Sequence, residues 1–310
     1  MRVVVSEFID EAALAKFGAE IAVTYDPGLV DDREALLAAL PGAQALIVRN
    51  RTRVDAAVLD AAPGLRVIGR LGVGLDNIDL EACATRGVVV HPATGANTLS
   101  VAEYVISVTL SLLRGVHGAN AAMIAGSWPR NALIGAEVSG RVMGLVGYGG
   151  IARAVAERAR AMGMQIAAFD PYLPETDPAW QDVRRCDLET LLASADVISL
   201  HVPLTPETRG LVGPGAIASM KPGAVVINTA RGGIVDEAAL AEGLRSGRLG
   251  GAALDVFETE PLTAEAAAKF AGLENLVLTP HVAGVTQEAN VRVSAITVEN
   301  VLRELAHADA

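Results

Sequence analysis

The chain has 310 residues, enough for two domains of ordinary size, and its core must be mostly aliphatic because hydrophobic residues make up 51% but aromatic ones only 4%. A net charge of −11 argues against nucleic-acid binding, which needs a basic surface to contact phosphates. Cys83 and Cys186 have neither metal-ligand nor disulfide-framework spacing, and no stretch has the character of a signal peptide or a membrane span. We therefore expect a cytoplasmic protein without a metal site, a nucleic-acid partner or a membrane partner.

Short apolar runs alternate with helical patterns through the first hundred residues. The runs predict strands at residues 3–5, 21–23, 45–48, 67–69 and 88–90, and the helical patterns cover residues 11–17, 32–40, 55–61 and 79–85. Such alternation is typical of a parallel sheet covered by helices. A long helical pattern over residues 100–115 follows and leads into the loop around Trp128 and Pro129.

The alternation of strands and helices restarts after Gly140. Strands are expected at residues 142–146, 165–169, 197–200, 224–228, 251–254 and 276–278, with helices at 151–159, 188–193, 213–219 and 237–246. A last amphipathic pattern over about residues 287–305 predicts a helix that could pack back on the first domain. The chain is therefore predicted to be an α/β protein with two Rossmann-like parallel-sheet domains, one flavodoxin-like and one dinucleotide-binding, and a cleft between them.

The most informative motif is the glycine-rich turn at residues 147–152, GYGGIA, which lies between a predicted strand and a predicted helix. This is the G-x-G-x-x-G/A fingerprint of dinucleotide-binding domains in its required context. Gly147 permits the tight turn, Gly149 lets a pyrophosphate approach the backbone, and Ala152 is small enough for close packing of helix on strand. Gly150 and Ile151 open the helix, whose free N–H groups and dipole favour an anion.

The second strand of this domain is followed by Asp170, about 20 residues after the glycine motif. A carboxylate at this point accepts hydrogen bonds from a ribose 2′-hydroxyl and repels a 2′-phosphate. Pro171 and Tyr172 follow it, with no arginine beside the acid to bind a phosphate. The sequence therefore predicts NAD rather than NADP as the cofactor.

Three loops after later strands bring chemically active side chains to the edge of the sheet where ligands bind. Arg231 follows the strand at residues 224–228, Glu260 lies in the loop after 251–254, and His281 follows 276–278. A planar guanidinium can bind a carboxylate and a ketone oxygen together, and an imidazole titrates near neutral pH. Glu260 would pair with the imidazole and stabilise its protonated form. The set predicts hydride transfer between a nicotinamide cofactor and a 2-oxo acid, with His281 as proton donor.

Two of these assignments have competitors. Glu258 lies two residues before Glu260, and we prefer Glu260 because Pro261 follows it. His201 also lies at a strand end, and we assign it to the cofactor side rather than to proton transfer.

With these residues assembled, the chain resembles the D-isomer-specific 2-hydroxyacid dehydrogenase family over essentially its whole length. The matching motifs are GVGLDNID at residues 72–79, NTLSVAE at 97–103, GYGGIA at 147–152, DVISLHVPLTPET at 196–208, MKPGAVVINTARG at 220–232, DVF at 255–257 and TPH at 279–281. The resemblance implies that Arg231, Glu260 and His281 are the catalytic set. The segment after the histidine departs from the family pattern, because it reads VAGV at residues 282–285.

The resemblance also implies the remaining binding residues. Backbone N–H groups of Val73 and Gly74 would hold the substrate carboxylate, Asn97 would contact the substrate, and Asp255 would face the nicotinamide carboxamide. The other residues expected to contact the cofactor are His201, Val202, Pro203, Thr208, Thr229, Ala230 and Gly284.

The domain organisation follows from the same resemblance. Residues 1–99, completed by 285–310, are expected to form a substrate-binding domain, and residues 100–284 an NAD-binding Rossmann domain. A homodimer built through the cofactor domains is implied. Because the 310 residues end without the C-terminal regulatory domain of serine-sensitive members, feedback control by serine is not expected.

The substrate itself is less determined. Within the family the chain is most similar to the sulfolactate- and phosphoglycerate-dehydrogenase types, so the best candidate is an anionic C3-substituted substrate such as sulfolactate. Arg49, Arg51, Arg70 and Arg130 are candidates for a second anion site, with Arg49 first; the alternative is that they pair with acids such as Asp76 and Asp79. Other functions still open are a phosphoglycerate dehydrogenase, a hydroxypyruvate or glyoxylate reductase and, from another class, an NAD-sensing binding protein.

Overall fold

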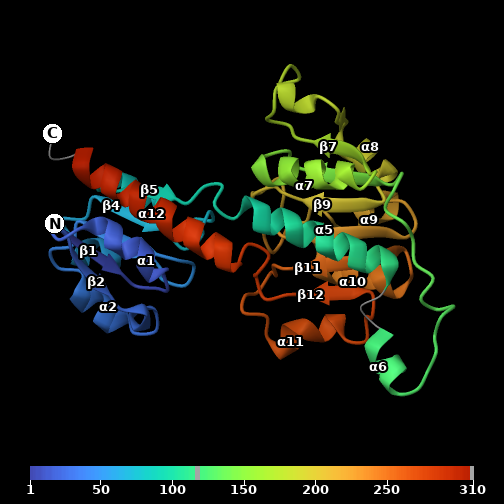
Figure 1. Cartoon of the computed structure of the whole chain (residues 1–310), viewed down its shortest axis with the longest axis horizontal. Coiled ribbons are helices and arrows are strands. Elements are labelled where there is room, and N and C mark those ends of the chain that lie inside the picture. Colours follow the sequence, from blue (N-terminus) through green and yellow to red (C-terminus); the bar gives the residue numbers. More distant parts are fainter. Residues whose placement is uncertain (116–118, 308–310) are drawn as a thin grey trace. The chain divides into compact units, whose positions relative to one another are not determined.

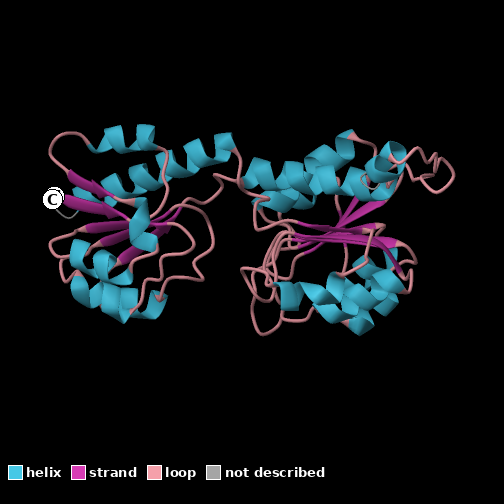
Figure 2. Ribbon diagram, turned by 90° about the horizontal axis from the view of Figure 1, so that it is seen from below, coloured by secondary structure: helices cyan, strands magenta, loops and turns pink. Residues whose placement is uncertain are grey.

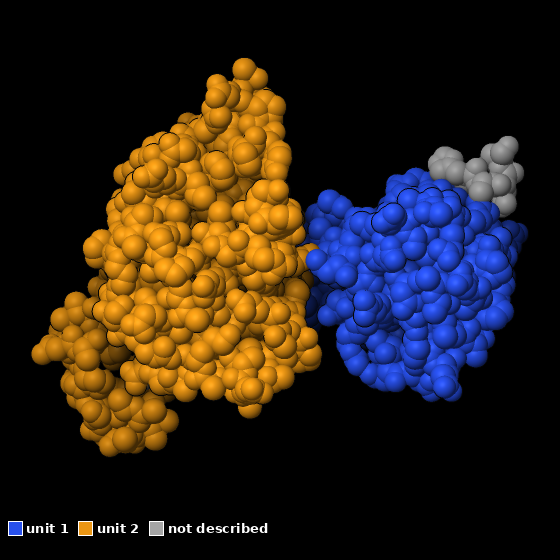
Figure 3. Space-filling model, turned by 180° about the vertical axis from the view of Figure 1, so that it is seen from behind, with its two compact units in different colours: residues 1–97, 285–310 blue, residues 98–284 orange. Residues whose placement is uncertain are grey.

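The computed structural model describes residues 1–115 and 119–307, and the chain divides into two compact units (Figures 1 and 3). Unit 1 comprises residues 1–97 and 285–310, and unit 2 comprises residues 98–284. The first boundary therefore lies between Asn97 and Thr98, slightly before the position expected from the sequence. In both units helices cover the two faces of a parallel sheet (Figure 2).

Unit 1 contains a five-stranded sheet with the order β2-β1-β3-β4-β5, which is flavodoxin-like. Its strands are β1 (Arg2–Val5), β2 (Ala22–Tyr25), β3 (Ala45–Val48), β4 (Val67–Arg70) and β5 (Val89–Pro92). Its helices are α1 (Glu11–Leu14), η1 (Ala15–Phe17), η2 (Pro27–Val30), α2 (Arg33–Ala39), α3 (Ala56–Ala61), α4 (Leu80–Thr85) and α12 (Gln287–His307).

The strands of unit 1 bury side chains on both faces, as the uninterrupted apolar runs predict. In β1, Val3 and Val5 pack on the side of α1 and α12, while Val4 packs on the side of α2, α3 and α4. Helix α12 lies directly on β4. The approach is so close that a Cβ added at Gly69 of β4 would lie 2.7 Å from the Val301 side chain of α12. The C-terminal helix is thus part of the first sheet's cover, which makes unit 1 discontinuous in sequence.

Unit 2 contains a seven-stranded parallel sheet with the order β12-β11-β10-β9-β6-β7-β8, a doubly wound dinucleotide-binding topology. Its strands are β6 (Val142–Val146), β7 (Gln165–Phe169), β8 (Arg184–Arg185), β9 (Val197–Leu200), β10 (Ala224–Asn228), β11 (Leu249–Leu254) and β12 (Leu276–Leu278). Its helices are α5 (Thr98–Arg114), α6 (Ala119–Ile124), α7 (Gly150–Ala161), η4 (Pro178–Trp180), α8 (Leu188–Ser194), α9 (Pro214–Ser219), α10 (Glu237–Arg245), α11 (Ala264–Ala267) and η5 (Ala268–Phe270).

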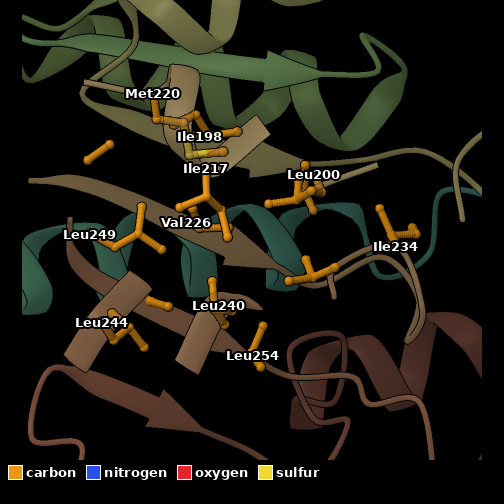
Figure 4. Close-up of a cluster of buried hydrophobic side chains, with 14 of the residues drawn as sticks. Ile198, Leu200, Ile217, Met220, Val226, Ile234, Leu240, Leu244, Leu249 and Leu254 are labelled. Atoms are coloured by element: carbon orange, nitrogen blue, oxygen red, sulfur yellow. The ribbon is translucent and has the colours of Figure 1, made fainter. Parts of the chain in front are cut away.

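Two apolar layers hold the sheet of unit 2. Helices α5 and α7 cover one face, and α8, α9 and α10 cover the other. Figure 4 shows the second layer, in which Ile198 of β9 lies beside Ile217 of α9, and Val226 of β10 lies between Ile217 and Leu240 of α10. Burial of these aliphatic side chains supplies the main driving force for folding and fixes the strand ends that carry the polar loops.

Several short elements of unit 2 were not expected from the sequence: β8, α6, η4, α11 and η5. The two-residue strand β8 is polar and lies at the sheet edge, so it has no apolar run to reveal it. Helix α6 buries none of its side chains and stands away from the sheet in Figure 1. Within residues 1–115 and 119–307, no helix is long and apolar enough to cross a membrane.

Aspartates start many of the helices. In α2, α3, α4, α8 and α10 the residue before the helix is an Asp whose carboxylate accepts a backbone N–H of the first turn. Helix α7 differs, because its cap is Gly149, which has no side chain to satisfy these groups. The difference leaves the first turn of α7 available to an external anion.

Candidate active site

Gly147 forms the turn at the end of β6, beside the end of β9. Its φ of 86° is in the left-handed region, and a Cβ there would lie 2.6 Å from the carbonyl oxygen of His201. The N–H of His201 in turn donates to the carbonyl of Val146 (2.7 Å). Only glycine suits both the conformation and the close approach, so β6 and β9 can end side by side at the point where the strand order reverses.

The start of α7 provides an open, unobstructed anion site. Cβ atoms added at Gly149 and Gly150 would meet nothing within 4 Å, whereas Ala152, one turn along, is fully buried against the sheet. Ile151 is half-buried between them. The backbone can therefore be approached closely by a ligand at Gly149 while the helix stays firmly packed at Ala152, as a pyrophosphate requires.

Asp170 follows β7 and organises the loop around it. Its Oδ2 accepts the N–H of Tyr148 (2.9 Å), and its Oδ1 accepts those of Tyr172 (2.9 Å) and Leu173 (3.2 Å). The carboxylate also lines a cavity of about 280 Å³ together with Phe169, Pro171, Arg185, Cys186 and Asp187. An acid at this strand end, beside a cavity, suits a ribose hydroxyl.

The structure adds an arginine to this cavity that the local sequence around Asp170 did not reveal. Arg185, from the edge strand β8, lines the same cavity. Its guanidinium pairs with Glu175 and lies 5.8 Å from the ring centre of Trp180. Its charge is therefore already balanced by a neighbouring acid, and Asp170 remains the group next to the ribose position.

His201 is poorly suited to proton transfer at neutral pH. Its Nε2 lies 2.9 Å from Oγ of Ser199, and burial lowers the pKa of His201 to about 4. The imidazole is therefore neutral throughout the physiological range. This supports the assignment of His201 to the cofactor side rather than to catalysis.

The other expected cofactor residues lie in the loops after β9, β10 and β12. In the first loop, which also holds Val202, the hydroxyl of Thr208 donates to the carbonyl of Pro203 (2.6 Å) and so serves to close the loop. In the second, Oγ1 of Thr229 is buried and has no hydrogen-bond partner among the described residues. Buried polar groups are normally hydrogen-bonded, so this hydroxyl is available to a ligand. Ala230 follows Thr229, and Gly284 is the last residue of unit 2.

Arg231 lies in a loop that is pressed against the loop carrying Glu260. A Cβ at Gly232 would lie 1.7 Å from the carbonyl oxygen of Phe257, so only glycine lets the two loops touch. Asn228 donates to the carbonyl of Arg231 (2.8 Å), and Arg231 itself donates from Nη1 to the carbonyl of Ala230 (2.6 Å). The backbone that carries the guanidinium is thus fixed from both sides.

Glu260 and His281 form a hydrogen-bonded pair. Oε2 of Glu260 lies 2.8 Å from Nδ1 of His281, and Oε1 accepts the N–H of Phe257 (3.0 Å). Burial alone would raise the pKa of the Glu260 carboxyl, but the bonds from His281 and Phe257 and the charges of His281 and Arg231 outweigh it. The pKa of Glu260 therefore lies below its ordinary value. With Nδ1 engaged, Nε2 is the ring nitrogen left for a substrate.

Asp255 holds the loop that carries His281. It is 1% exposed, and its carboxylate accepts the hydroxyl of Thr279 (2.6 Å) and the N–H groups of Val282 and Ala283 (2.8 Å each). The N–H of His281 donates to the Asp255 carbonyl (2.8 Å), and His281 adopts a left-handed φ of 56°. A contact of Asp255 with the nicotinamide stays a prediction. Its hydrogen bonds to the loop that carries His281 are observed in the structure.

One residue in this network, Tyr104, was not predicted from the sequence. The hydroxyl of Tyr104, on α5, lies 2.6 Å from Oγ1 of Thr279 and so extends the chain of hydrogen bonds from Asp255. The motif at residues 97–103 ends at Glu103, directly before Tyr104. Helical periodicity alone does not indicate which polar side chain of a helix contacts a loop distant in sequence.

In unit 1, Arg49 follows β3 and has a neutral partner. Its Nη2 donates to Oδ1 of Asn290 on α12 (2.9 Å), and its guanidinium lies 5.8 Å from the ring centre of Phe8. Burial lowers the pKa of Arg49, although the charge of Glu7 opposes this. A half-buried guanidinium that meets an amide is a good anion-binding candidate.

The other three arginines differ from Arg49. Arg51 is exposed and forms an ion pair with Asp31. Arg70 donates from Nη1 to the carbonyl of Leu71 (2.8 Å) and lies against Gly72, where a Cβ would come within 1.7 Å of that nitrogen. Arg130 is exposed in unit 2. Arg51 thus pairs with an acid, Asp31, in the way that the alternative interpretation supposed.

The loop after β4 presents the residues expected to bind the substrate carboxylate. Val73 is 40% exposed and Gly74 is half-exposed, so the backbone here is accessible. Asn97, the last residue of unit 1, has a buried Oδ1 without a hydrogen-bond partner in the described part of the chain. Asn77 ties this loop to the Arg49 loop, because its Nδ2 donates to the carbonyl of Arg49 (3.2 Å).

Glu7, at the end of β1, is a second anchor that the sequence did not reveal. Its carboxylate is nearly inaccessible and accepts the N–H groups of Arg49 (2.8 Å), Arg51 (3.2 Å) and Thr52 (2.8 Å). An internal anion therefore occupies the strand-end position between β1 and β3 where a flavodoxin-like sheet binds a ligand's phosphate.

These observations fit a bound dinucleotide in unit 2. The glycine turn, the start of α7, the acid after β7 and the orphaned Thr229 hydroxyl all lie at the carboxyl ends of strands. Among the residues that the structure describes, no group of three His, Cys, Asp or Glu side chains could hold a metal ion.

Known proteins with similar sequences and structures agree with this assignment. A protein-family model described as "D-isomer specific 2-hydroxyacid dehydrogenase, NAD binding domain" matches residues 106–283. The (S)-sulfolactate dehydrogenase of Chromohalobacter salexigens is 56% identical over 304 residues, 98% of either chain. A D-3-phosphoglycerate dehydrogenase of Archaeoglobus fulgidus is 42% identical over 97% of this chain, which spans 57% of that enzyme's length. The crystal structure of the TT0316 protein from Thermus thermophilus superposes with a TM-score of 0.90 at 38% identity, covering 99% of this chain and 97% of that one.

A dinucleotide fold with a His–Glu pair and an arginine at one sheet edge defines an NAD-dependent dehydrogenase. The chain belongs to the D-isomer-specific 2-hydroxyacid dehydrogenase family. It is therefore an NAD-dependent enzyme that acts on the CH–OH group of a 2-hydroxy acid.

Proposed function

We propose that the protein transfers hydride between NAD(H) and a D-2-hydroxy acid or its 2-oxo acid that carries a second anionic group on C3. Sulfolactate and sulfopyruvate are the best candidates, because the Chromohalobacter relative at 56% identity is a sulfolactate dehydrogenase. Its (S) label suits the D arrangement, since sulfur outranks the carboxylate in naming priority.

The observation that carries this proposal is the environment of Arg49. Its guanidinium is partly buried and bonded to the neutral amide of Asn290, so its charge is less compensated than that of Arg51, which pairs with Asp31. A sulfonate or phosphate would give this guanidinium a directly bonded anionic partner through a charge-assisted hydrogen bond. Phosphate chemistry fits the same group, so a phosphoglycerate dehydrogenase is the second candidate, supported by the relative at 42% identity.

Arg231 and the loop after β4 would hold the reacting end of the substrate. The nicotinamide, when bound, supplies or accepts the hydride. The guanidinium of Arg231 can bind the substrate carboxylate and polarise the C2 oxygen, while the accessible N–H groups at Val73 and Gly74 bind the carboxylate. These contacts would orient C2 and stabilise the negative charge that grows on its oxygen during reduction.

His281 would move the proton. In the reductive direction the protonated Nε2 donates to the C2 oxygen, and the product is the hydroxyl group; in the oxidative direction neutral Nε2 removes that proton. Glu260, bonded to Nδ1, favours the protonated ring and fixes its orientation. The neutral His201 takes no part in this step.

The protein is also proposed to work as a cytoplasmic homodimer built through unit 2. Large apolar side chains around α6 and the loop after it are strongly exposed: Ile124 88%, Trp128 76% and Ile134 79%. A second copy would bury them, since exposed apolar groups of this size cluster at interfaces. The free thiols of Cys83 and Cys186 suit a reducing compartment.

The first experiment is the loss of NADH absorbance with sulfopyruvate, phosphohydroxypyruvate, hydroxypyruvate, glyoxylate, oxaloacetate and pyruvate. The proposal expects kcat/KM for sulfopyruvate to exceed that for every other acid by about tenfold or more, equivalent to about 1.4 kcal/mol of transition-state binding. A preference for phosphohydroxypyruvate would select the second candidate. A preference for glyoxylate or hydroxypyruvate would remove the C3 anion from the proposal.

Arg49→Met tests the anion site directly. The KM for the dianionic substrate should rise on the order of 10²-fold, the loss of a charged hydrogen bond worth about 2–3 kcal/mol, while KM for glyoxylate stays within about threefold. Arg51→Met is the matched control, because this arginine is exposed and already paired with Asp31. An unchanged KM in Arg49→Met would remove Arg49 from the site.

A further inference from the structure

Glu237, the first residue of α10, carries a buried carboxylate in contact with the loop of Glu260. Residue 237 is only 3% exposed. Its Oε1 accepts the N–H of Glu258 (2.7 Å), and its Oε2 pairs with Nζ of Lys269 on η5 (2.7 Å). A carboxylate this deeply buried is tolerated only because both oxygens have charged or polar partners.

Glu237 and Glu260 accept hydrogen bonds from the N–H groups of consecutive residues. The N–H of Phe257 donates to Oε1 of Glu260 (3.0 Å), and the carbonyl of Phe257 lies against Gly232. The next N–H along the chain, that of Glu258, is the one bound by Glu237. The peptide between Phe257 and Glu258 is therefore held by the Arg231 loop on its carbonyl side and by Glu237 on its N–H side.

We propose that Glu237 is a positioning residue that acts through Glu260: it fixes the 257–258 peptide so that the Glu260 carboxylate faces Nδ1 of His281. This inference rests on the proposed roles of Glu260 and His281. It assigns to α10 and η5, which carry no reacting group, the task of orienting the acid of the His–Glu pair.

The charged groups around Glu237 lie on two sides of it. Lys269 faces it from η5, and the hydrogen bond that Lys269 donates to Glu237 raises the pKa of Lys269, with further contributions from the charges of Glu237, Glu258 and Asp236. Across the loop, Glu260 faces His281 and Arg231. Glu237 is therefore separated from the reacting ring by the loop that it holds.

The test compares Glu237→Ala with the wild type, using the 2-oxo acid that the wild type reduces fastest. We expect kcat to fall about 10- to 100-fold, because displacement of a catalytic group by a fraction of an ångström costs this much, with NADH affinity within about threefold. The alkaline limb of the pH–rate profile should move to lower pH, as in Glu260→Gln, because the protonated imidazole loses its partner.

A double-mutant cycle separates action through Glu260 from general loosening. If Glu237 acts through Glu260, adding Glu237→Ala to Glu260→Gln changes kcat by less than about threefold. Independent, multiplicative losses, or a fall in kcat without a shift of the alkaline limb, would overturn the inference. Should Glu260→Gln itself leave rate and profile unchanged, the proposed roles of Glu260 and His281 fail instead.

Two further variants guard against misfolding. Glu242→Ala changes an exposed acid on the same helix and should leave kcat unchanged. Glu237→Gln keeps an acceptor oxygen but loses the charge that strengthens the bond, so kcat should fall by about three- to tenfold with a smaller shift in the same direction. If the alanine variant does not fold, an unshifted profile and unchanged kcat in Glu237→Gln would overturn the inference.

Discussion

Nδ1 of His281 lies 2.8 Å from Oε2 of Glu260, in a loop that Asp255 anchors through the N–H groups of Val282 and Ala283. The ring is thus held at one nitrogen and along its backbone, and its second nitrogen, Nε2, is left for a substrate. The pair converts a half-exposed histidine into an oriented acid and base.

Replacing Glu260 by Gln should shift the pH dependence of reduction. The protonated imidazole loses its carboxylate partner and the bond that orients its ring, so the alkaline limb of the kcat/KM profile should move to lower pH and the rate at pH 7.5 should fall about tenfold or more. Because the pKa of Glu260 lies below its ordinary value of 4.5, the wild-type pairing persists above that pH and is lost only as pH falls below it. A pH series of initial rates checks this; an unmoved alkaline limb in the variant contradicts it.

His201 and His281 should differ sharply in activity assays. His281→Asn removes the proton donor, and kcat should fall by about 10³-fold or more, whereas His201→Gln should retain kcat within about tenfold because the native ring is neutral at pH 7. NADH affinity, measured by fluorescence titration, reports any cofactor-side effect of His201. Equal losses of kcat in the two variants would reverse the assignment.

His201 should also make the folded protein sensitive to acid. The native pKa of about 4 lies below the ordinary value of 6.5, so the unfolded chain binds the proton first and stability falls as pH drops from about 6.5 to about 4. The full penalty is on the order of 3 kcal/mol and should be absent from His201→Gln. Urea unfolding of both proteins at pH 5 and pH 7.5 tests this; parallel losses would refute it.

Gly147 and Gly149 should respond differently to alanine. At Gly147 the positive φ and the 2.6 Å approach to the His201 carbonyl predict a loss of at least about 2 kcal/mol of stability. At Gly149 the new methyl group meets open space, so stability should be nearly unchanged while the dissociation constant for NADH rises about tenfold or more. Thermal unfolding and NADH titration separate the two effects, and weak NADH binding without lost stability in both variants would argue against this division.

The preference for NADH over NADPH should depend on Asp170. Arg185 should contribute to binding of a 2′-phosphate once the Asp170 carboxylate is removed. Asp170→Ala leaves the N–H groups of Tyr148, Tyr172 and Leu173 without their acceptor, close to the guanidinium of Arg185. A 2′-phosphate can use these donors, so the kcat/KM ratio of NADH to NADPH should fall about 10²-fold. Adding Arg185→Met should return about tenfold of that change. A ratio unaffected by Asp170→Ala would show that other groups exclude the phosphate.

Much of the site was predictable from sequence because it follows from local pattern and topology. The glycine fingerprint requires only a strand, a turn and a helix in sequence, and Gly147, Gly149 and Ala152 behave in the structure as their spacing indicates. The carboxyl ends of parallel strands share one edge, so Arg231 and His281 could be assigned to one site from their strands alone.

The tertiary structure decided the contacts between segments that are distant in sequence. Three such contacts arise from tertiary packing and are not encoded by periodicity or spacing. They are Gly232 with Phe257, Glu7 with the N–H groups of the Arg49 loop, and Glu237 with the N–H of Glu258. The same holds for Arg185, which an edge strand brings into the cavity beside Asp170. Alternating apolar runs specify which strands form, because burial follows a local period, whereas the partner of each buried polar group is set only when the sheet and its helices close around it.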